Sequence, residues 1–284
     1  MAQIKEQIKT NFLKSNIVQQ LIYVNIAIYV ATLLFGFFGT LIDENQNLFY
    51  TYFALSSDLG DTLWHPWSIV TYGFVHASFV HLLMNMLILY YIGNLFLDYF
   101  TPKNLLTYYL LGTVFGGLLY LLTYNFVPSL SGPGGAILMG ASAGVTAIFI
   151  GIATYMPKFE IRLAFIGYVK LWILASIWVF WDLIQLTGDN TGGRLAHLGG
   201  ALFGFLSMYY YTNGFRINLN IPQFKKKSPL KTVYKSKESP KRKVTREDSD
   251  NTQQRVNGIL DKIGKSGYDS LSSEEKEFLF KQGD

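Results

Sequence analysis

The sequence holds one serine hydroxyl between small residues, in the stretch Gly-Ala-Ser-Ala-Gly at positions 140–144. The preceding residues 131–135 are glycine and proline rich and should be irregular, whereas residues 137–156 are apolar and uncharged. Ser142 should therefore lie near the first turn of a helix, where free backbone N–H groups and the helix dipole favour a developing anion. Taken alone, such a pattern more often marks close packing of two helices through small residues.

Two other apolar segments carry polar side chains that would complement a serine nucleophile. His81 and Asn85 stand four residues apart, and therefore on one face of a helix. His197 opens another apolar segment, in which Gly200 and Gly204 follow nearly in line with it, so a neighbouring helix can approach the imidazole closely. For His81 or Asn85 alone, a hydrogen bond to a neighbouring helix is the simpler interpretation.

Together these residues predict acyl-transfer chemistry. A serine hydroxyl becomes a good nucleophile when a base takes its proton, and a neutral histidine is the usual base, so Ser142 and His197 would supply the pair. The resulting oxyanion needs donors, which the Ser142 backbone N–H, the His81 imidazole and the Asn85 amide could provide. Asp182 could orient a histidine, although a carboxylate near a helix C-terminus more simply faces water or a donor.

The composition argues against a metal site. The chain has no cysteine and four histidines, and no carboxylate stands at ligand spacing beside His81 and Asn85. We therefore expect neither a metal nor a cofactor.

The elements that hold these residues should be membrane-spanning helices. Hydrophobic residues make up 50% of the 284 positions and charged residues 15%, whereas about a quarter of residues are charged in soluble domains. A spanning helix needs about 20 residues, so the longest uncharged runs must be divided. The predicted spans are six, near residues 17–38, 68–97, 104–126, 138–156, 171–187 and 195–214.

The placement of lysine and arginine predicts the orientation, because these residues are enriched on the cytoplasmic side. They precede the first span, occupy the second and fourth connections and fill the C-terminal tail, whereas residues 39–66 and 128–136 contain none. Both termini should therefore be cytoplasmic. Spans two, four and six then begin outside, which brings Ser142, His197 and the His81/Asn85 pair to compatible depth.

The fourth span is also short. Residues 141–156 would extend about 24 Å at 1.5 Å per residue, against about 30 Å of hydrocarbon. Ser142 should therefore lie several ångströms below the outer surface, at the depth where the other polar side chains converge.

In order, spacing and topology, these motifs resemble those of the rhomboid family of intramembrane serine proteases. The resemblance covers about residues 15–214 and joins a His-x-x-x-Asn pattern, a Gly-x-Ser pattern and an Ala-His-x-x-Gly-x-x-x-Gly pattern. The positions similar to the family's are His76, His81, Asn85, Gly140, Ser142, Ala196, His197, Gly200 and Gly204.

The resemblance implies a serine–histidine dyad in a six-helix bundle that cleaves transmembrane protein substrates near the outer membrane face. It also implies an integral multi-pass protein of the bacterial cytoplasmic membrane. The alternative is a non-catalytic rhomboid-like chaperone or scaffold that binds transmembrane helices without cutting them. The presence of both Ser142 and His197 argues against that alternative, because a binding protein needs neither.

Three positions depart from the family's pattern. Ala143 stands where glycine is common, and Trp67-Ser68 stands where many members have Trp-Arg. Thr146 occupies the position, four residues after the serine, where an aromatic side chain often supports the histidine. The packing around His197 is therefore not predicted by the resemblance.

Beyond the last span, residues 215–251 are basic and contain serine and proline. We expect a disordered linker that is attracted to anionic lipid headgroups by about 1 kcal/mol per basic residue, and not a nucleic-acid-binding element, since no folded reader accompanies it. Residues 252–284 should form a small helical cytoplasmic segment, with helices near 253–263 and 273–281, and Ser272 and Glu275 have the spacing of a capping box.

The predicted architecture is an all-α membrane protein. It comprises a cytoplasmic N-terminus at 1–16, a six-transmembrane-helix rhomboid-like bundle at 17–214, the basic linker and the small C-terminal helical segment.

Overall fold

The computed structural model describes residues 2–41, 48–130, 136–164, 166–214 and 246–282. Within these ranges the chain is mostly helical and has two short two-stranded antiparallel sheets. It divides into two compact units, Met1–Pro222 and Gln223–Asp284, and all candidate site residues belong to the first unit. The stretch 131–135, expected to be irregular, lies outside the described residues, as do residues 215–245 of the expected linker.

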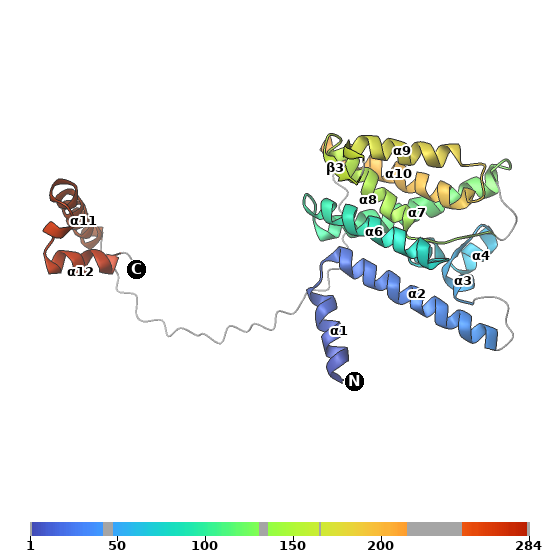
Figure 1. Ribbon diagram of the computed structural model, residues 1–284, viewed down its shortest axis with the longest axis horizontal. Coiled ribbons are helices and arrows are strands. Elements are labelled where there is room, and N and C mark those ends of the chain that lie inside the picture. Colours follow the sequence, from blue (N-terminus) through green and yellow to red (C-terminus); the bar gives the residue numbers. More distant parts are fainter. Residues whose placement is uncertain (1, 42–47, 131–135, 165, 215–245, 283–284) are drawn as a thin grey trace. The chain divides into compact units, whose positions relative to one another are not determined.

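Seven longer helices form the first unit (Figure 1): α1 (Ala2–Lys14), α2 (Ile17–Leu41), α6 (Phe79–Leu97), α7 (Pro102–Phe126), α8 (Ser142–Tyr155), α9 (Leu171–Ile184) and α10 (Thr191–Thr212). The connection from α2 to α6 contains α3 (Leu48–Phe53), α4 (Leu59–Trp64), α5 (Ser68–Thr71) and the 3₁₀ turn η1 (Tyr72–Phe74). In it, β1 (Leu55–Ser56) pairs with β2 (Ile137–Leu138), directly ahead of the candidate serine. The connection from α8 to α9 is a hairpin of β3 (Glu160–Leu163) and β4 (Gly167–Lys170).

Three of the described helices are long and apolar enough to cross a membrane, namely residues 17–39 of α2, α6 and α7. Helices α8 and α9 are apolar but have only 14 residues each, or about 21 Å at 1.5 Å per residue. Each of the six segments predicted to span the membrane contains a helix. That all six helices cross the membrane stays a prediction.

Helix α6 begins later than the predicted second span, which started at residue 68. Ser78 is in an extended conformation and its hydroxyl accepts a hydrogen bond from the His81 backbone N–H at 3.2 Å, which caps the helix at Phe79. The residues before it form α5 and η1 instead. His76 therefore precedes α6, whereas His81 lies in its first turn.

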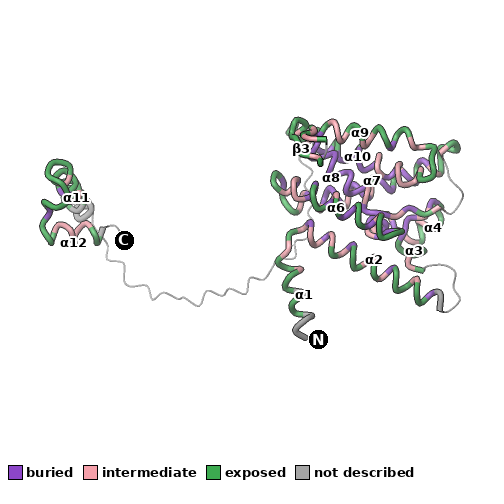
Figure 2. Tube along the Cα trace, viewed as in Figure 1, coloured by how far each residue is buried: buried purple, intermediate pink, exposed green. Residues whose placement is uncertain are grey.

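Helix α8 is the centre of the first unit, packed mainly against α10 and α7, with α6 on another side. All residues from Ala143 to Ala153 are buried, as Figure 2 shows. A Cβ added at Gly200 would lie 2.1 Å from the Ala143 carbonyl oxygen, and one added at Gly204 would lie 2.4 Å from that of Ala147. The two glycines therefore let the backbones of α8 and α10 touch.

The second unit contains α11 (Arg246–Ser266), the 3₁₀ turn η2 (Tyr268–Ser270) and α12 (Ser273–Gln282). Helix α11 begins before residue 252, so the helical part is longer than predicted. The capping box is present, because the Ser272 N–H donates to Glu275 at 2.8 Å and the Glu275 N–H donates to the Ser272 hydroxyl at 3.3 Å. The Ser272 N–H, together with Lys262, holds the pKa of Glu275 below its ordinary value of 4.5.

Candidate active site

Ser142 is the first residue of α8, as its sequence context predicts. The turn ahead of it is tied down at two points: the Gly140 N–H donates to the Tyr72 carbonyl oxygen at 2.9 Å, and the Ala141 N–H donates to Nε2 of His76 at 3.4 Å. Ala141 is buried, whereas Ser142 is partly exposed. The fixed turn thus presents the serine hydroxyl at the start of the central helix.

Gly140 also leaves space for the His81 ring. Its φ of +133° is a conformation that residues with a Cβ rarely adopt. A Cβ at this position would lie 2.8 Å from Nε2 of His81 and 3.6 Å from Oγ of Ser142. The imidazole and the hydroxyl therefore flank the same point, which only a glycine leaves open.

Asn85 lies one turn after His81 on α6 and is 6% exposed. Its side-chain N–H group donates to the His81 carbonyl oxygen at 2.9 Å, and a primary amide has a second N–H left to donate. His76 is fully buried, with its ring centroid 5.1 Å from that of His81. His76 therefore contacts both the turn ahead of Ser142 and the His81 ring.

One cavity of about 390 Å³ is lined by Ser142, His197, His81 and Asn85. The structure thus brings these residues together from α8, α10 and α6, while His76 is not part of the lining. In the part of the chain that the structure describes, no hydrogen bond joins the Ser142 hydroxyl to His197. The two side chains share the cavity without a direct hydrogen bond.

The surroundings of His197 come from α9. Nδ1 of His197 lies 3.1 Å from Oδ2 of Asp182, and the Trp178 ring centroid lies 6.1 Å from the imidazole centroid. Thr146, at the position where an aromatic was expected, is buried, and its hydroxyl has no hydrogen-bond partner among the described residues. Helix α9 therefore supplies an aromatic ring beside His197, whereas α8 has threonine at residue 146.

Asp182 is held by a second contact. Nη1 of Arg194 donates to Oδ1 of Asp182 at 3.1 Å, and Nη2 of Arg194 donates to Gln185. The sequence contained a signal for this cluster, since a short connection joins the end of α9 to the start of α10 and Trp178 stands one turn before Asp182. Arg194 and Trp178 had no predicted part in the site.

The first connection is anchored by Trp67, which stands where the family's Trp-Arg pair begins. Its indole N–H donates to the Tyr52 carbonyl oxygen at 2.7 Å, and its ring packs edge-on against His65 at 5.3 Å between centroids. Neither residue lines the cavity at Ser142. The contacts of Trp67 therefore stabilise the connection without an arginine beside it.

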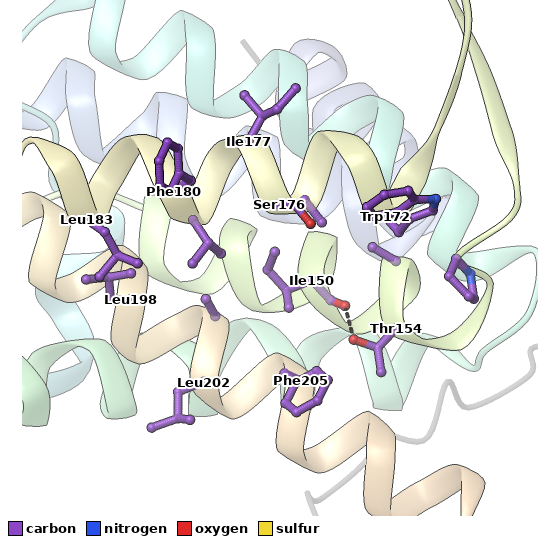
Figure 3. A pocket seen from close by; sticks show the side chains of 15 residues that line it. Ile150, Thr154, Trp172, Ser176, Ile177, Phe180, Leu183, Leu198, Leu202 and Phe205 are labelled. Atoms are coloured by element: carbon purple, nitrogen blue, oxygen red, sulfur yellow. Dashed lines mark hydrogen bonds between the residues drawn. The ribbon is translucent and has the colours of Figure 1, made fainter.

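A larger cavity of about 990 Å³ lies between α8, α9 and α10 (Figure 3). None of the residues that line it has a titratable side chain, and the Thr154 hydroxyl donates to the Ile150 carbonyl oxygen at 2.7 Å. This cavity is suited to an apolar occupant and offers no group for acid–base chemistry. Among the described residues there is also no cluster of three or more metal-ligating side chains.

Comparison with known protein families matches residues 63–214 to the Rhomboid domain, which is more than half of the chain. The chain belongs to the rhomboid family. Its rhomboid domain and its long apolar helices identify an integral membrane protein. Residues 243–281 match a second family, described as a family of unknown function (DUF6576), and this match covers α11 and all but the last residue of α12.

Two curated rhomboid relatives are similar to this chain. "RHOMBOID-like protein 12, mitochondrial" of Arabidopsis thaliana is 30% identical over 144 residues, 47% of this chain and 43% of that protein. "Rhomboid-like protease 3" of Toxoplasma gondii is 29% identical over 147 residues, 51% of each chain. The chain thus spans about half the length of these relatives. Both relatives are eukaryotic, and the bacterial membrane stays a prediction. The cytoplasmic position of both termini also stays a prediction.

Proposed function

We propose that this rhomboid is an intramembrane serine endopeptidase that cleaves transmembrane protein substrates, with Ser142 as nucleophile and His197 as general base. The observation that carries the proposal is the single cavity lined by Ser142, His197, His81 and Asn85. The relative named a protease supports the same reaction class.

In the proposed reaction, Nε2 of His197 takes the proton of the Ser142 hydroxyl as Oγ attacks the scissile carbonyl carbon. His197 then gives that proton to the leaving amine, and the acyl group remains on Ser142. A water molecule deprotonated by His197 attacks this ester, which releases the acid product and restores the serine. Because this water must reach Ser142, a partly polar cavity inside an apolar bundle suits the reaction.

The oxyanion of each tetrahedral intermediate would be stabilised by three donors. The Ser142 backbone N–H is among the N–H groups that have no helical partner at the start of α8. His81 and Asn85 line the same cavity, and the imidazole and the second amide N–H of Asn85 would be the other two donors. Removal of a single oxyanion donor typically lowers kcat by about 10²–10³-fold.

Cleavage of a single-span reporter substrate in liposomes tests the dyad. Ser142→Ala and His197→Ala should abolish cleavage, and Asn85→Ala should slow it by about 10²-fold because a donor is lost. Ser176→Ala, the same change in the separate apolar cavity, should leave the rate unchanged. Undiminished cleavage by Ser142→Ala or His197→Ala would refute the dyad.

A fluorophosphonate reagent separates the protease from a rhomboid-like chaperone or scaffold. An activated serine should be labelled in the native membrane, and Ser142→Ala should remove the label. If wild-type protein is not labelled and cleaves none of several transmembrane helices that it binds, the protease proposal fails and the scaffold hypothesis takes its place.

A further inference from the structure

His197 makes a contact that a serine–histidine dyad does not require. The carboxylate of Asp182, on α9, lies 3.1 Å from Nδ1 of His197, on α10. Nδ1 and Nε2 stand on opposite sides of an imidazole, so this contact leaves Nε2 for Ser142. The inference that follows rests on the proposed function, since it assigns a role toward the proposed base.

The contact selects one tautomer of the imidazole. A carboxylate has only acceptors, so Nδ1 must donate and must carry the proton of the neutral ring. Nε2 is then unprotonated, which is the form able to accept the proton of a serine hydroxyl. The opposite tautomer would place two acceptors 3.1 Å apart and would leave Nε2 unable to act as a base.

The carboxylate itself is held in place. Its side chain is 5% exposed, and a buried carboxylate needs a partner. Arg194 supplies one through Nη1 at 3.1 Å, and its other terminal nitrogen donates to Gln185. Because a guanidinium cannot lose its proton, Arg194 is a permanent cation that offsets the unfavourable position of Asp182 near the C-terminus of α9.

Trp178, on the same helix as Asp182, lies beside the His197 ring. It stands four residues before Asp182, one turn away on α9, with its ring centroid 6.1 Å from that of His197. It also lines the cavity at Ser142. The imidazole is therefore bounded by a hydrogen bond at Nδ1 and by an indole ring, and both come from α9.

We propose that Asp182 is a positioning residue for His197. It accepts the Nδ1 proton, holds the imidazole in the tautomer whose Nε2 serves as base for Ser142, and stabilises the imidazolium that forms during proton transfer. Arg194 keeps the carboxylate oriented for this contact.

The kinetic test uses the full-length protein in liposomes with a single-span substrate. Asp182→Asn should lower kcat by about 10²–10⁴-fold with KM nearly unchanged, because an amide can donate to Nδ1 and select the wrong tautomer. Asp182→Glu, which retains a carboxylate, should restore part of the loss. A kcat of Asp182→Asn within twofold of wild type would overturn the proposal.

Two control variants separate positioning from charge balance. Asp189→Asn makes the same change at an exposed position in the connection between α9 and α10, and should retain wild-type kcat. Asp182→Asn combined with Arg194→Gln removes both charges together. If Asp182 only neutralises Arg194, the double variant recovers wild-type kcat and the proposal fails; if Asp182 positions His197, it stays slow.

A tautomer measurement makes the inference independent of activity. ¹⁵N NMR of histidine-labelled protein in liposomes, with His197→Gln to assign the signal, should show Nδ1 protonated and Nε2 unprotonated at neutral pH. Asp182→Asn should reverse or mix this state. An Nε2-protonated His197 in the wild type, or no change in Asp182→Asn, contradicts the proposal. The expected tautomer in a protein that neither cleaves nor is labelled would refute the protease and leave the positioning contact standing.

Discussion

At the scale of single residues, Gly140 occupies a position in the candidate site where a side chain is disfavoured for two reasons. Its φ of +133° and the His81 ring beside it are independent reasons for the absence of a side chain. The same residue is followed by Ala141, whose N–H donates to His76. The glycine of the Gly-x-Ser pattern is therefore required both by the backbone conformation of the turn and by the space that the His81 ring occupies.

Gly140→Ala should lower kcat strongly. The backbone strain is about 1–3 kcal/mol, and the added methyl group must displace the His81 imidazole, which would stand 2.7–2.8 Å away. Cleavage kinetics together with thermal unfolding measure the two effects. Gly214→Ala is the matched control, because Gly214 has a φ of +94° but nothing within 4 Å of an added Cβ. A wild-type kcat in Gly140→Ala would contradict the assigned position of His81.

At the scale of elements, the contact between α8 and α10 decides how the proposed nucleophile meets its base. The two helices touch backbone to backbone at Gly200 and Gly204, and His197 lies one turn before Gly200. A change in helix separation therefore moves the imidazole relative to Ser142. A shift of about 1 Å in a catalytic group can reduce the rate by about 10²-fold.

Gly200→Ala should reduce both stability and kcat. Its Cβ would stand 2.1 Å from the Ala143 carbonyl oxygen, and overpacking of this kind destabilises by about 1–3 kcal/mol. Thermal unfolding in detergent and cleavage in liposomes measure the two losses. Gly258→Ala, on α11, adds a Cβ that meets nothing within 4 Å and should leave both properties of the rhomboid domain unchanged. Retention of full activity in Gly200→Ala would show that α8 and α10 can separate without consequence.

At the scale of the whole molecule, a membrane unit is followed by a separate unit with its own small core. Ile259 and Leu271 are buried there, and Lys262 pairs with Glu275 at 2.9 Å. Residues 215–245, which follow α10 and precede α11 in the sequence, are rich in lysine. Since basic residues next to a membrane are drawn to anionic lipid, we propose that this stretch contacts lipid headgroups.

The isolated fragment 215–284 should bind anionic vesicles weakly, and the binding should fall as salt is added, because screened charges attract less. Replacement of Lys225, Lys226 and Lys227 by glutamine should weaken the binding by about 1 kcal/mol per residue. Cosedimentation with anionic and neutral vesicles at two salt concentrations measures this. Equal binding to both vesicle types, or indifference to salt, would remove the proposed lipid contact.

The sequence by itself determined the helical class, the approximate helices and the set of polar residues that share a cavity. Apolar length and i, i+4 spacing are local properties, and the predicted alternation of sides along a membrane chain would bring the starts of α6, α8 and α10 to the same level. The chemistry of the residue types predicted Ser142 and His197 as a pair, and the family pattern points to the same two residues.

Only the tertiary structure decided what surrounds His197. Its contacts with Asp182 and Trp178 depend on how α9 and α10 are rotated about their axes, and both helices are apolar over most of their surface, so hydrophobic pattern does not specify the rotation. The start of α6 was likewise set by the Ser78 cap and the folded turns before it, not by the length of the apolar run. Sequence patterns of this kind predict helices and their order, whereas side-chain contacts between helices depend on packing.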